Sequence, residues 1–309
     1  SKLLQLQHNY NSELLFGSNY GYRSGLNNSM ISHLKDKYLL LHKKLNFKEN
    51  DNILDIGSND GTFLNFFPVK ANKVGCDPTA KKFKKYYDKD VRKIYSIFDK
   101  KIANSFKYKF KLVSAIAMFY DLDNPVQFCK NVEKVIDRNG IFHLEIAYLP
   151  DIIKQNSFDT FCQEHLTYFS LISFKYLINR TNFKILDYRR NSINGGSINF
   201  DLSLKNSKHK PKQKKLASLY NYEKKNNFHK LSKYVKYFNR IVKNINKIEK
   251  SINLISKQNK TIYCFGASTK GNVTLQLCNL NHKKIKGIYD VNNEKFGRHT
   301  PGTNIIIKD

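Results

Sequence analysis

The chain has 309 residues, of which 40% are hydrophobic and 13% aromatic, so it is long enough for about two packed domains and is not a disordered protein. Its formal net charge of +29 at pH 7 would suit nucleic acid or an anionic membrane as a partner. The lysines behind that charge are spread over nearly every segment, however, so we interpret it as compositional background that still attracts a phosphate-bearing substrate.

The first 150 residues alternate between predicted strands and helices. Short apolar runs predict strands at 52–56, 72–77, 111–119 and 141–146. Helices are predicted at 30–45, directly after a glycine loop at 57–61, in the lysine-rich segment 79–89 and at 125–137. The run at 111–119 is nearly continuous in apolar residues, as expected for a central parallel strand covered on both faces. This alternation predicts an α/β fold with a parallel, doubly wound sheet.

The pattern changes in the second half of the chain. Residues 184–190 and 196–204 are typical of two paired strands that flank a turn. A helical stretch rich in Lys and Asn follows at about 212–257, with apolar residues every three or four positions. We expect this stripe to pack inside the molecule, and a coiled-coil dimer is the alternative. A second strand–loop–helix unit begins at 261–268, and its next strand is predicted at 284–290.

The stretch LDIGSNDGTFL (54–64) runs from a strand into a glycine loop. Gly57 and Gly61 allow the backbone to bend and to approach a ligand closely. Asp60 in this loop would repel a pyrophosphate, but it suits a cationic ligand that carries an amino group, such as S-adenosylmethionine. Asp77 ends the next strand, where a carboxylate can bind ribose hydroxyls. A turn without a ligand and a nicotinamide cofactor are the weaker interpretations.

In the stretch FCQEHLTYFS (161–170), Glu164 and His165 stand side by side. Such a pair alone is a structural pair, a stray metal ligand or the acid–base apparatus of an enzyme. The pair follows the predicted strand 141–146, near the strand ends where open α/β folds bind substrates. We therefore single out His165, and interpret His33, His143 and the remaining histidines as structural.

The five cysteines are odd in number and show no CxxC or zinc spacing. Most lie in apolar runs, so we expect reduced core thiols in a cytoplasmic protein. We find no run of about 18 apolar residues and no signal peptide. Because Ser1 begins in mid-pattern and Asp309 follows a strand-like run, we expect a fragment that lacks both ends.

Taken together, these segments resemble the S-adenosylmethionine-dependent sugar C-methyltransferases that act on nucleotide-linked 4-keto-6-deoxyhexoses. Seven motifs carry the resemblance in the family's order: residues 5–30, LDIGSNDGTFL (54–64), FYDLDNPVQF (119–128), FDTFCQEHLTYFS (158–170), NGGSINF (194–200), FGASTKGN (265–272) and residues 289–307. The resemblance implies a zinc domain, which would lie before Ser1, followed by a methyltransferase domain and a smaller Rossmann-like C-terminal α/β domain joined by a long helix. No metal site is expected in this chain.

The resemblance also implies a mechanism. His165 would remove the proton from the carbon beside the keto group, and the enolate carbon would then attack the methyl group of the donor. Glu164 would orient His165 or bind sugar hydroxyls, and Tyr20 and Tyr22 would fold over the sugar. Cys162 replaces a tyrosine of the family, which leaves the methylated carbon open.

We expect the donor to contact the glycine loop and the end of the second strand, and the substrate to contact three later motifs. The predicted donor contacts are Asp55, Gly57, Ser58, Gly61, Asp77 and Pro78. The predicted substrate contacts are Tyr168, Asn194, Gly195, Gly196, Ser268 and Lys270. Ser268 and Lys270 have two possible interpretations. They form either an anion site at the start of a helix or a vestigial loop that only packs.

The predicted boundaries are a substrate-binding N-terminal segment at 1–29, a methyltransferase domain at 30–205, a helical linker at 206–258 and a C-terminal domain at 259–309. The expected partner is a nucleotide-linked keto sugar, without nucleic acid or membrane. Alternatives are a sugar O-methyltransferase, in which the same histidine deprotonates a hydroxyl, a methyltransferase acting on RNA, and a silent scaffold protein.

Overall fold

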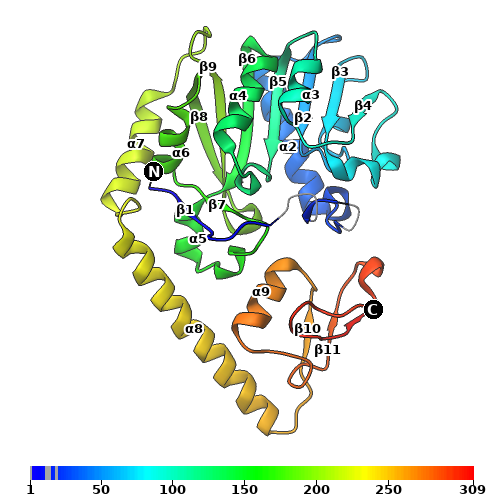
Figure 1. The fold of residues 1–309 in the computed structure, drawn as a ribbon, viewed down its shortest axis with the longest axis vertical. Coiled ribbons are helices and arrows are strands. Elements are labelled where there is room, and N and C mark those ends of the chain that lie inside the picture. Colours follow the sequence, from blue (N-terminus) through cyan, green and yellow to red (C-terminus); the bar gives the residue numbers. More distant parts are fainter. Residues whose placement is uncertain (1, 11–14, 18–19) are drawn as a thin grey trace. The chain divides into compact units, whose positions relative to one another are not determined.

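The computed structural model describes residues 2–10, 15–17 and 20–309, so part of the predicted N-terminal segment lies outside the described residues. The chain divides into two compact units (Figure 1). The first comprises Ser1–Tyr148 and Leu166–Asn226, and the second comprises Leu149–His165 and Asn227–Asp309. The segment 149–165, which we assigned to the methyltransferase domain from the sequence, is therefore grouped with the C-terminal part of the chain.

The first unit is built on a seven-stranded sheet with the order β4-β3-β2-β5-β6-β9-β8. The parallel strands are β2 (Asn52–Ile56), β3 (Asn72–Cys76), β4 (Val91–Ile94), β5 (Phe110–Ile116) and β6 (Ile136–Ala147). The antiparallel strands are β8 (Phe183–Asn191) and β9 (Ser197–Leu204), the predicted hairpin. The order reverses between β2 and β5, so the predicted doubly wound sheet is confirmed and its switch point lies between these two strands.

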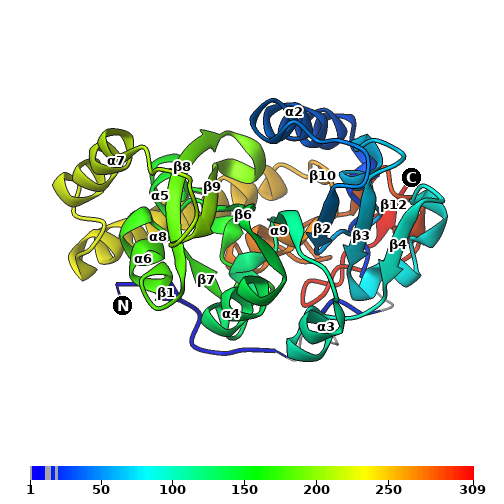
Figure 2. The same ribbon diagram turned by 90° about the horizontal axis from the view of Figure 1, so that it is seen from above.

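Helices cover both faces of this sheet. α2 (Asn28–Leu45) lies on one face, and α3 (Lys100–Ser105) and α4 (Pro125–Val135) lie on the other (Figure 2). Leu34 and Leu41 of α2 belong to one buried core with residues from β2, β5 and β6. On the opposite face, Phe128 of α4 packs against Phe119 and Phe142. Alternate residues of each strand thus enter different cores, as the pleat requires.

Three further elements complete the first unit. α6 (Leu171–Ile178) stacks Phe174 on Phe200 of β9 with 4.3 Å between the ring centroids, and α7 (Gln213–Lys225) adjoins α6 and β8. β1 (Leu4–Gln5) pairs antiparallel with β7 (Thr167–Tyr168). A chain segment from the extreme N-terminus is thereby fixed beside the residues that follow the Glu164–His165 pair.

Two predicted helices are wrong. After Gly61 the chain forms only one 3₁₀ turn, Leu64–Phe66, because Pro68 follows too soon for a helix to continue. The segment 79–89 forms two separate 3₁₀ turns, Pro78–Lys81 and Lys84–Tyr86. Its lysines recur at helical neighbour spacings and repel one another, and so short a segment cannot offset the cost of helix nucleation.

The second unit contains a three-stranded parallel sheet of β10 (Tyr263–Phe265), β11 (Gly287–Tyr289) and β12 (Ile307–Lys308). Its helices are α5 (Leu149–Gln155), α8 (Leu231–Lys257) and α9 (Thr269–Leu277). The predicted helical stretch at 212–257 is therefore two helices, and they are assigned to different units.

The apolar stripe of α8 packs within its own unit. Ile245, Ile248 and Ile252 lie against the core that surrounds Ile288 of β11, which confirms intramolecular packing over this part of the stripe. Leu231, at the start of the helix, is 77% exposed and takes no part in it. Among the described residues, no helix combines the length and apolar character needed to cross a bilayer.

Candidate active site

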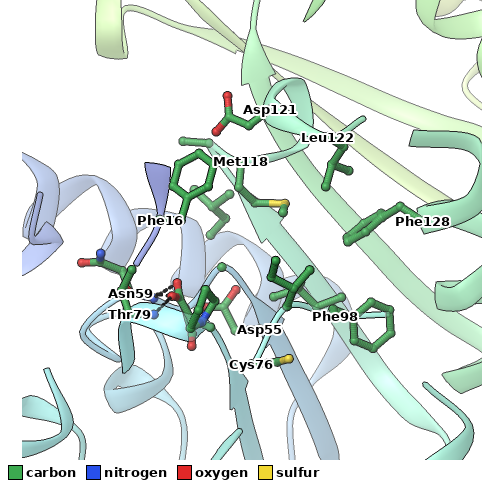
Figure 3. Close-up of a pocket in the computed structure, with 18 of the residues that line it drawn as sticks. Phe16, Asp55, Asn59, Cys76, Thr79, Phe98, Met118, Asp121, Leu122 and Phe128 are labelled. Atoms are coloured by element: carbon green, nitrogen blue, oxygen red, sulfur yellow. Dashed lines mark hydrogen bonds between the residues drawn. The ribbon is translucent and has the colours of Figure 1, made fainter. Parts of the chain in front are cut away.

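A cavity of about 360 Å³ opens in the first unit at the carboxyl ends of β2, β3, β5 and β6. This position spans the switch point of the sheet, where open α/β folds bind their ligands. Figure 3 shows the aromatic rings of Phe98 and Phe128 on one side of the cavity, and Asn59 and Thr79 on the other. The cavity therefore has an apolar wall facing a polar one, a pattern typical of small-molecule sites.

The charge of this cavity is opposite to that of the chain. Seven acidic residues line it: Asp55, Asp60, Asp77, Asp99, Asp121, Asp123 and Glu145. Among the described lining residues there is no Lys, Arg or His. In a protein with 54 basic and 25 acidic residues, such a lining favours a cationic ligand and disfavours a phosphate inside the cavity.

The bend predicted for the glycine loop is confirmed. Gly57 and Gly61 have φ angles of 75° and 79°, a region that strongly favours glycine. A Cβ at Gly57 would lie 2.8 Å from the side chain of Met118, and one at Gly61 would lie 2.4 Å from the ring of Tyr87. The protein's own side chains, rather than the ligand, fill the space beside these glycines.

Asp77 lies at the end of β3, as predicted, and its carboxylate organises the loop. It accepts hydrogen bonds from the backbone N–H of Asn59 at 2.8 Å, and from the N–H and hydroxyl of Thr79 at 2.6 Å each (Figure 3). Pro78 follows it along the cavity wall. Three of the four carboxylate lone pairs are thus occupied, which leaves one for a ligand hydroxyl.

Asp55 and Ser58 also line the cavity. The Asp55 carboxylate accepts a hydrogen bond of 2.6 Å from the hydroxyl of Ser114. Burial and the nearby charge of Asp77 raise the pKa of Asp55 to about 7, although the bond from Ser114 opposes the shift. The Ser58 hydroxyl is hydrogen-bonded to Tyr87 at 2.8 Å. Asp55 is therefore an acidic group in this cavity whose charge changes near neutral pH.

Asp60 lines the cavity, and it also binds a segment of the protein itself. Its carboxylate accepts from the backbone N–H of Gly25 at 2.9 Å and lies 3.4 Å from the guanidinium of Arg23. Asn59 accepts from the N–H of Ser24 at 2.9 Å and donates to the carbonyl of Tyr22 at 3.1 Å. These contacts hold residues 22–25, which we call the N-terminal strap, against the glycine loop.

Tyr20 and Tyr22 line the same cavity. Tyr22 is the first residue of the strap, and Tyr20 lies two residues before it. Their rings lie edge to face, with 6.4 Å between the centroids. Partial burial and the carboxylates of Asp60 and Glu145 raise the pKa of the Tyr22 phenol, which keeps it a neutral hydrogen-bond donor. The structure thus brings both predicted tyrosines together with five of the six predicted donor contacts at one cavity. Gly61, the sixth predicted donor contact, shapes the glycine loop but does not line the cavity.

Sequence reasoning missed Glu145. It lies near the carboxyl end of β6 and lines the cavity, and the Nε2 atom of His33 lies 2.9 Å and 3.1 Å from its two carboxylate oxygens. His33 does have the structural role that we predicted, because it supports this carboxylate. The sequence did contain a signal for Glu145, because it is an acidic residue inside the apolar run IFHLEI.

The Glu164–His165 pair lies in the second unit, beside the start of α9. His165 Nδ1 donates to the carbonyl of Thr160 at 3.0 Å, and the Thr269 hydroxyl lies 3.4 Å from Glu164. Burial and the charge of Lys270 lower the pKa of His165 to about 4, while the bond to Thr160 opposes this. Burial raises the pKa of Glu164, partly offset by Thr269. Two predicted motifs a hundred residues apart thus meet within this unit.

Three side chains of this loop could also hold a metal ion. The sulfur of Cys162, a carboxylate oxygen of Glu164 and a ring nitrogen of His165 all lie within 4.8 Å of one another. The side chain of Cys162 is buried. Its replacement of the family's tyrosine therefore adds a soft ligand to the acid–base pair.

The other predicted substrate contacts have local structural roles. Tyr168 is 1% exposed within β7, so its predicted contact with substrate stays a prediction. Asn194, Gly195 and Gly196 form the turn between β8 and β9, all with positive φ. The Ser268 hydroxyl caps α9 by accepting from the N–H of Gly271 at 3.0 Å.

The chain matches two family models that together cover most of its length. Residues 27–188 match a methyltransferase domain, and residues 192–309 match the C-methyltransferase C-terminal domain. The chain belongs to the S-adenosylmethionine-dependent C-methyltransferase family. Both the α/β fold and the smaller C-terminal α/β domain predicted from the sequence agree with this membership.

The chain is also similar to individual proteins. The C-methyltransferase NovU of Streptomyces niveus is 26% identical over 309 residues, which is 99% of this chain and 73% of NovU. Among solved structures, the PH0226 protein of Pyrococcus horikoshii matches 59% of this chain and 94% of its own at 16% identity and a TM-score of 0.47. N-methyltransferase NodS of Bradyrhizobium japonicum, bound to S-adenosyl-L-homocysteine, matches 62% and 95% at 12% identity and a TM-score of 0.43.

The cavity of this C-methyltransferase fits its methyl donor. S-adenosylmethionine carries a sulfonium and an ammonium group, and the acidic lining provides opposite charge for both. Asp77 has a remaining acceptor position for a ribose hydroxyl, and Phe98 and Phe128 offer an apolar wall for a flat ring. Asp55, Ser58 and Pro78 complete the residues that would hold the donor.

Proposed function

We propose that this enzyme methylates the carbon beside the ketone of a nucleotide-linked 4-keto-6-deoxy sugar. The observation that carries the proposal is the similarity of nearly the whole chain to the C-methyltransferase NovU, together with the match of residues 192–309 to the C-methyltransferase C-terminal domain. The substrate class rests on the seven motifs that resemble the sugar enzymes. We also propose a cytoplasmic location, in keeping with an odd number of cysteines that lie mostly in apolar runs.

His165 is the proposed general base. Because its Nδ1–H donates to the carbonyl of Thr160, the basic lone pair is on Nε2. With a pKa of about 4 the ring is neutral at pH 7 and can accept a proton. The positive charge of Lys270, which contributes to that low pKa, would also stabilise negative charge that develops on an enolate. Glu164 would bind a sugar hydroxyl or orient the ring.

The bound donor supplies an electrophilic methyl group on its sulfonium. In the first unit, Asp55 and Asp77 would bind the donor, and Tyr20 and Tyr22 would donate hydrogen bonds to sugar oxygens. The acidic cavity supports a sugar over RNA, because a run of phosphates would meet seven carboxyl groups there. Oxygen methylation remains the second candidate, because His165 could deprotonate a hydroxyl.

Hydrogen exchange separates the two reactions. A thymidine diphosphate-linked 4-keto-6-deoxyhexose is incubated with the enzyme and S-adenosyl-L-homocysteine in deuterated water. We expect deuterium to enter the carbon beside the ketone, and His165→Gln to slow this at least about 100-fold, since a general base contributes that much. His282→Gln, an exposed histidine of the same unit, is the control. Exchange that His165→Gln leaves unchanged would overturn the proposal, as would methylation of oxygen when S-adenosylmethionine replaces S-adenosyl-L-homocysteine.

A further inference from the structure

Glu145 lines the cavity from a strand that carries none of the predicted donor contacts. It lies on β6, whereas Asp55 lies on β2 and Asp77 follows β3. In the sheet order, β3 and β6 are three strand positions apart, which corresponds to roughly 14 Å at the usual strand spacing. The donor residues and Glu145 thus lie on opposite sides of the switch point between β2 and β5.

The Glu145 carboxylate is held in place and held charged. Lys37 Nζ and Asn191 Nδ2 each donate to its Oε2 atom at 2.8 Å, and His33 bridges both oxygens. Burial opposes the charged form, but Lys37 and His33 outweigh it and hold the pKa of Glu145 well below its ordinary value. Among the described residues, Oε1 accepts only from His33. It therefore keeps capacity to accept another hydrogen bond.

Behind Glu145, polar residues continue away from the cavity between α2 and the sheet. Lys37 also donates to Asn199, and His143 Nδ1 lies 2.7 Å from Asp201, which in turn binds Lys44 at 2.9 Å. We call these residues, with Glu145, His33 and Asn191, the polar seam. Apolar residues of similar volume would stabilise such an interface equally well or better. Stability alone therefore gives no reason for a carboxylate where the seam reaches the cavity.

We propose that Glu145 forms a binding site for a hydroxyl group of the methyl acceptor. A permanently charged carboxylate can only accept hydrogen bonds, so its ligand must be a donor. The neighbouring phenol of Tyr22, which is affected by the charge of Glu145, can donate to an acceptor oxygen. A sugar ring offers both kinds of group. This inference rests on the proposed function, because it places the sugar over β6 while the donor lies over β2 and β3.

The test compares Glu145→Gln with Asp201→Asn, which alters the same polar seam without lining the cavity. The thymidine diphosphate-linked 4-keto-6-deoxyhexose is the probe. We expect Glu145→Gln to raise the KM for the probe about 10-fold or more, because a hydrogen bond to a charged group is lost. Asp201→Asn should leave that KM within about twofold of wild type. Equal KM effects in both variants, or none in Glu145→Gln, would overturn the inference.

A second measurement does not depend on the sugar. Titration calorimetry with S-adenosyl-L-homocysteine should give the same affinity for wild type and Glu145→Gln; a loss of about 10-fold would show that Glu145 binds the donor's ammonium group and would overturn the inference. If Glu145→Gln does not fold, the double variant Lys37→Met/Glu145→Gln removes both buried charges and takes its place. A wild type that binds S-adenosyl-L-homocysteine but not the probe refutes the proposed function alone, and calorimetry then decides the assignment of Glu145.

Discussion

At the scale of single residues, Asp55 is a titrating group of the donor cavity. With a pKa of about 7 it is half protonated at neutral pH, and a bound cation will favour its charged form. We therefore expect S-adenosylmethionine to bind more tightly as the pH rises from 6 to 8, with release of a proton. Calorimetry in two buffers of different ionisation enthalpy measures this release. Asp55→Asn should bind the donor more weakly, without proton release, and release that persists in it would contradict the assignment.

The same shift predicts a cost in stability. The folded-state pKa of about 7 exceeds the unfolded value of 3.8, so stability is lost as the pH rises through 7. At pH 8, the free energy of unfolding of Asp55→Asn should consequently exceed that of wild type by on the order of a few kcal/mol. Unfolding in denaturant measures this difference. At pH 3, where both states carry a proton, this gain should disappear. If the variant is less stable than wild type at pH 8, the charged form of Asp55 does not destabilise the folded state, which would contradict the raised pKa.

At the scale of elements, hydrogen bonds hold the N-terminal strap against the glycine loop, so we expect a change in one to affect the other. The strap passes so close to Asp60 that a Cβ at Gly25 would lie 2.7 Å from its Oδ2 atom, whereas a Cβ at Gly21 would meet nothing within 4 Å. Gly25→Ala should therefore loosen the strap and lower the affinity for S-adenosyl-L-homocysteine about 10-fold, and Gly21→Ala should not. Limited proteolysis near the strap provides an independent readout. Equal affinity in both variants would mean that strap docking does not support donor binding.

At the scale of the whole molecule, each compact unit has its own apolar core, one around Ile53 and Leu112 and the other around Ile285 and Ile288. The described donor cavity belongs entirely to the first unit. Binding of S-adenosyl-L-homocysteine should then slow hydrogen exchange in β2, β3 and β5 by the factor that its concentration and Kd dictate, and leave β10 and β11 nearly unchanged. Equal protection of both sheets would contradict this independence.

The sequence determined strands β2, β3, β5 and β6, the β8–β9 hairpin and the place of the donor loop, but it did not reveal β1, β4 or β7. Continuous apolar runs such as 52–56 need burial on both faces, and glycines at a strand end permit the bend, so these features are local. The sequence also named Asp55, Asp77, Tyr20 and Tyr22, because their neighbours form recognisable motifs. The two helices predicted after β2 and β3 failed because repulsion between lysines and a proline outweighed apolar spacing.

Only the tertiary structure decided which distant residues meet. Glu145 and His33 are 112 residues apart and belong to a strand and a helix, so no spacing rule could pair them. The same holds for Asp60 and Gly25, and for the loop of His165 and the start of α9. Hydrogen bonds and charge pairs of this kind depend on which faces the elements present after packing, and packing is a property of the complete fold rather than of any local run of residues.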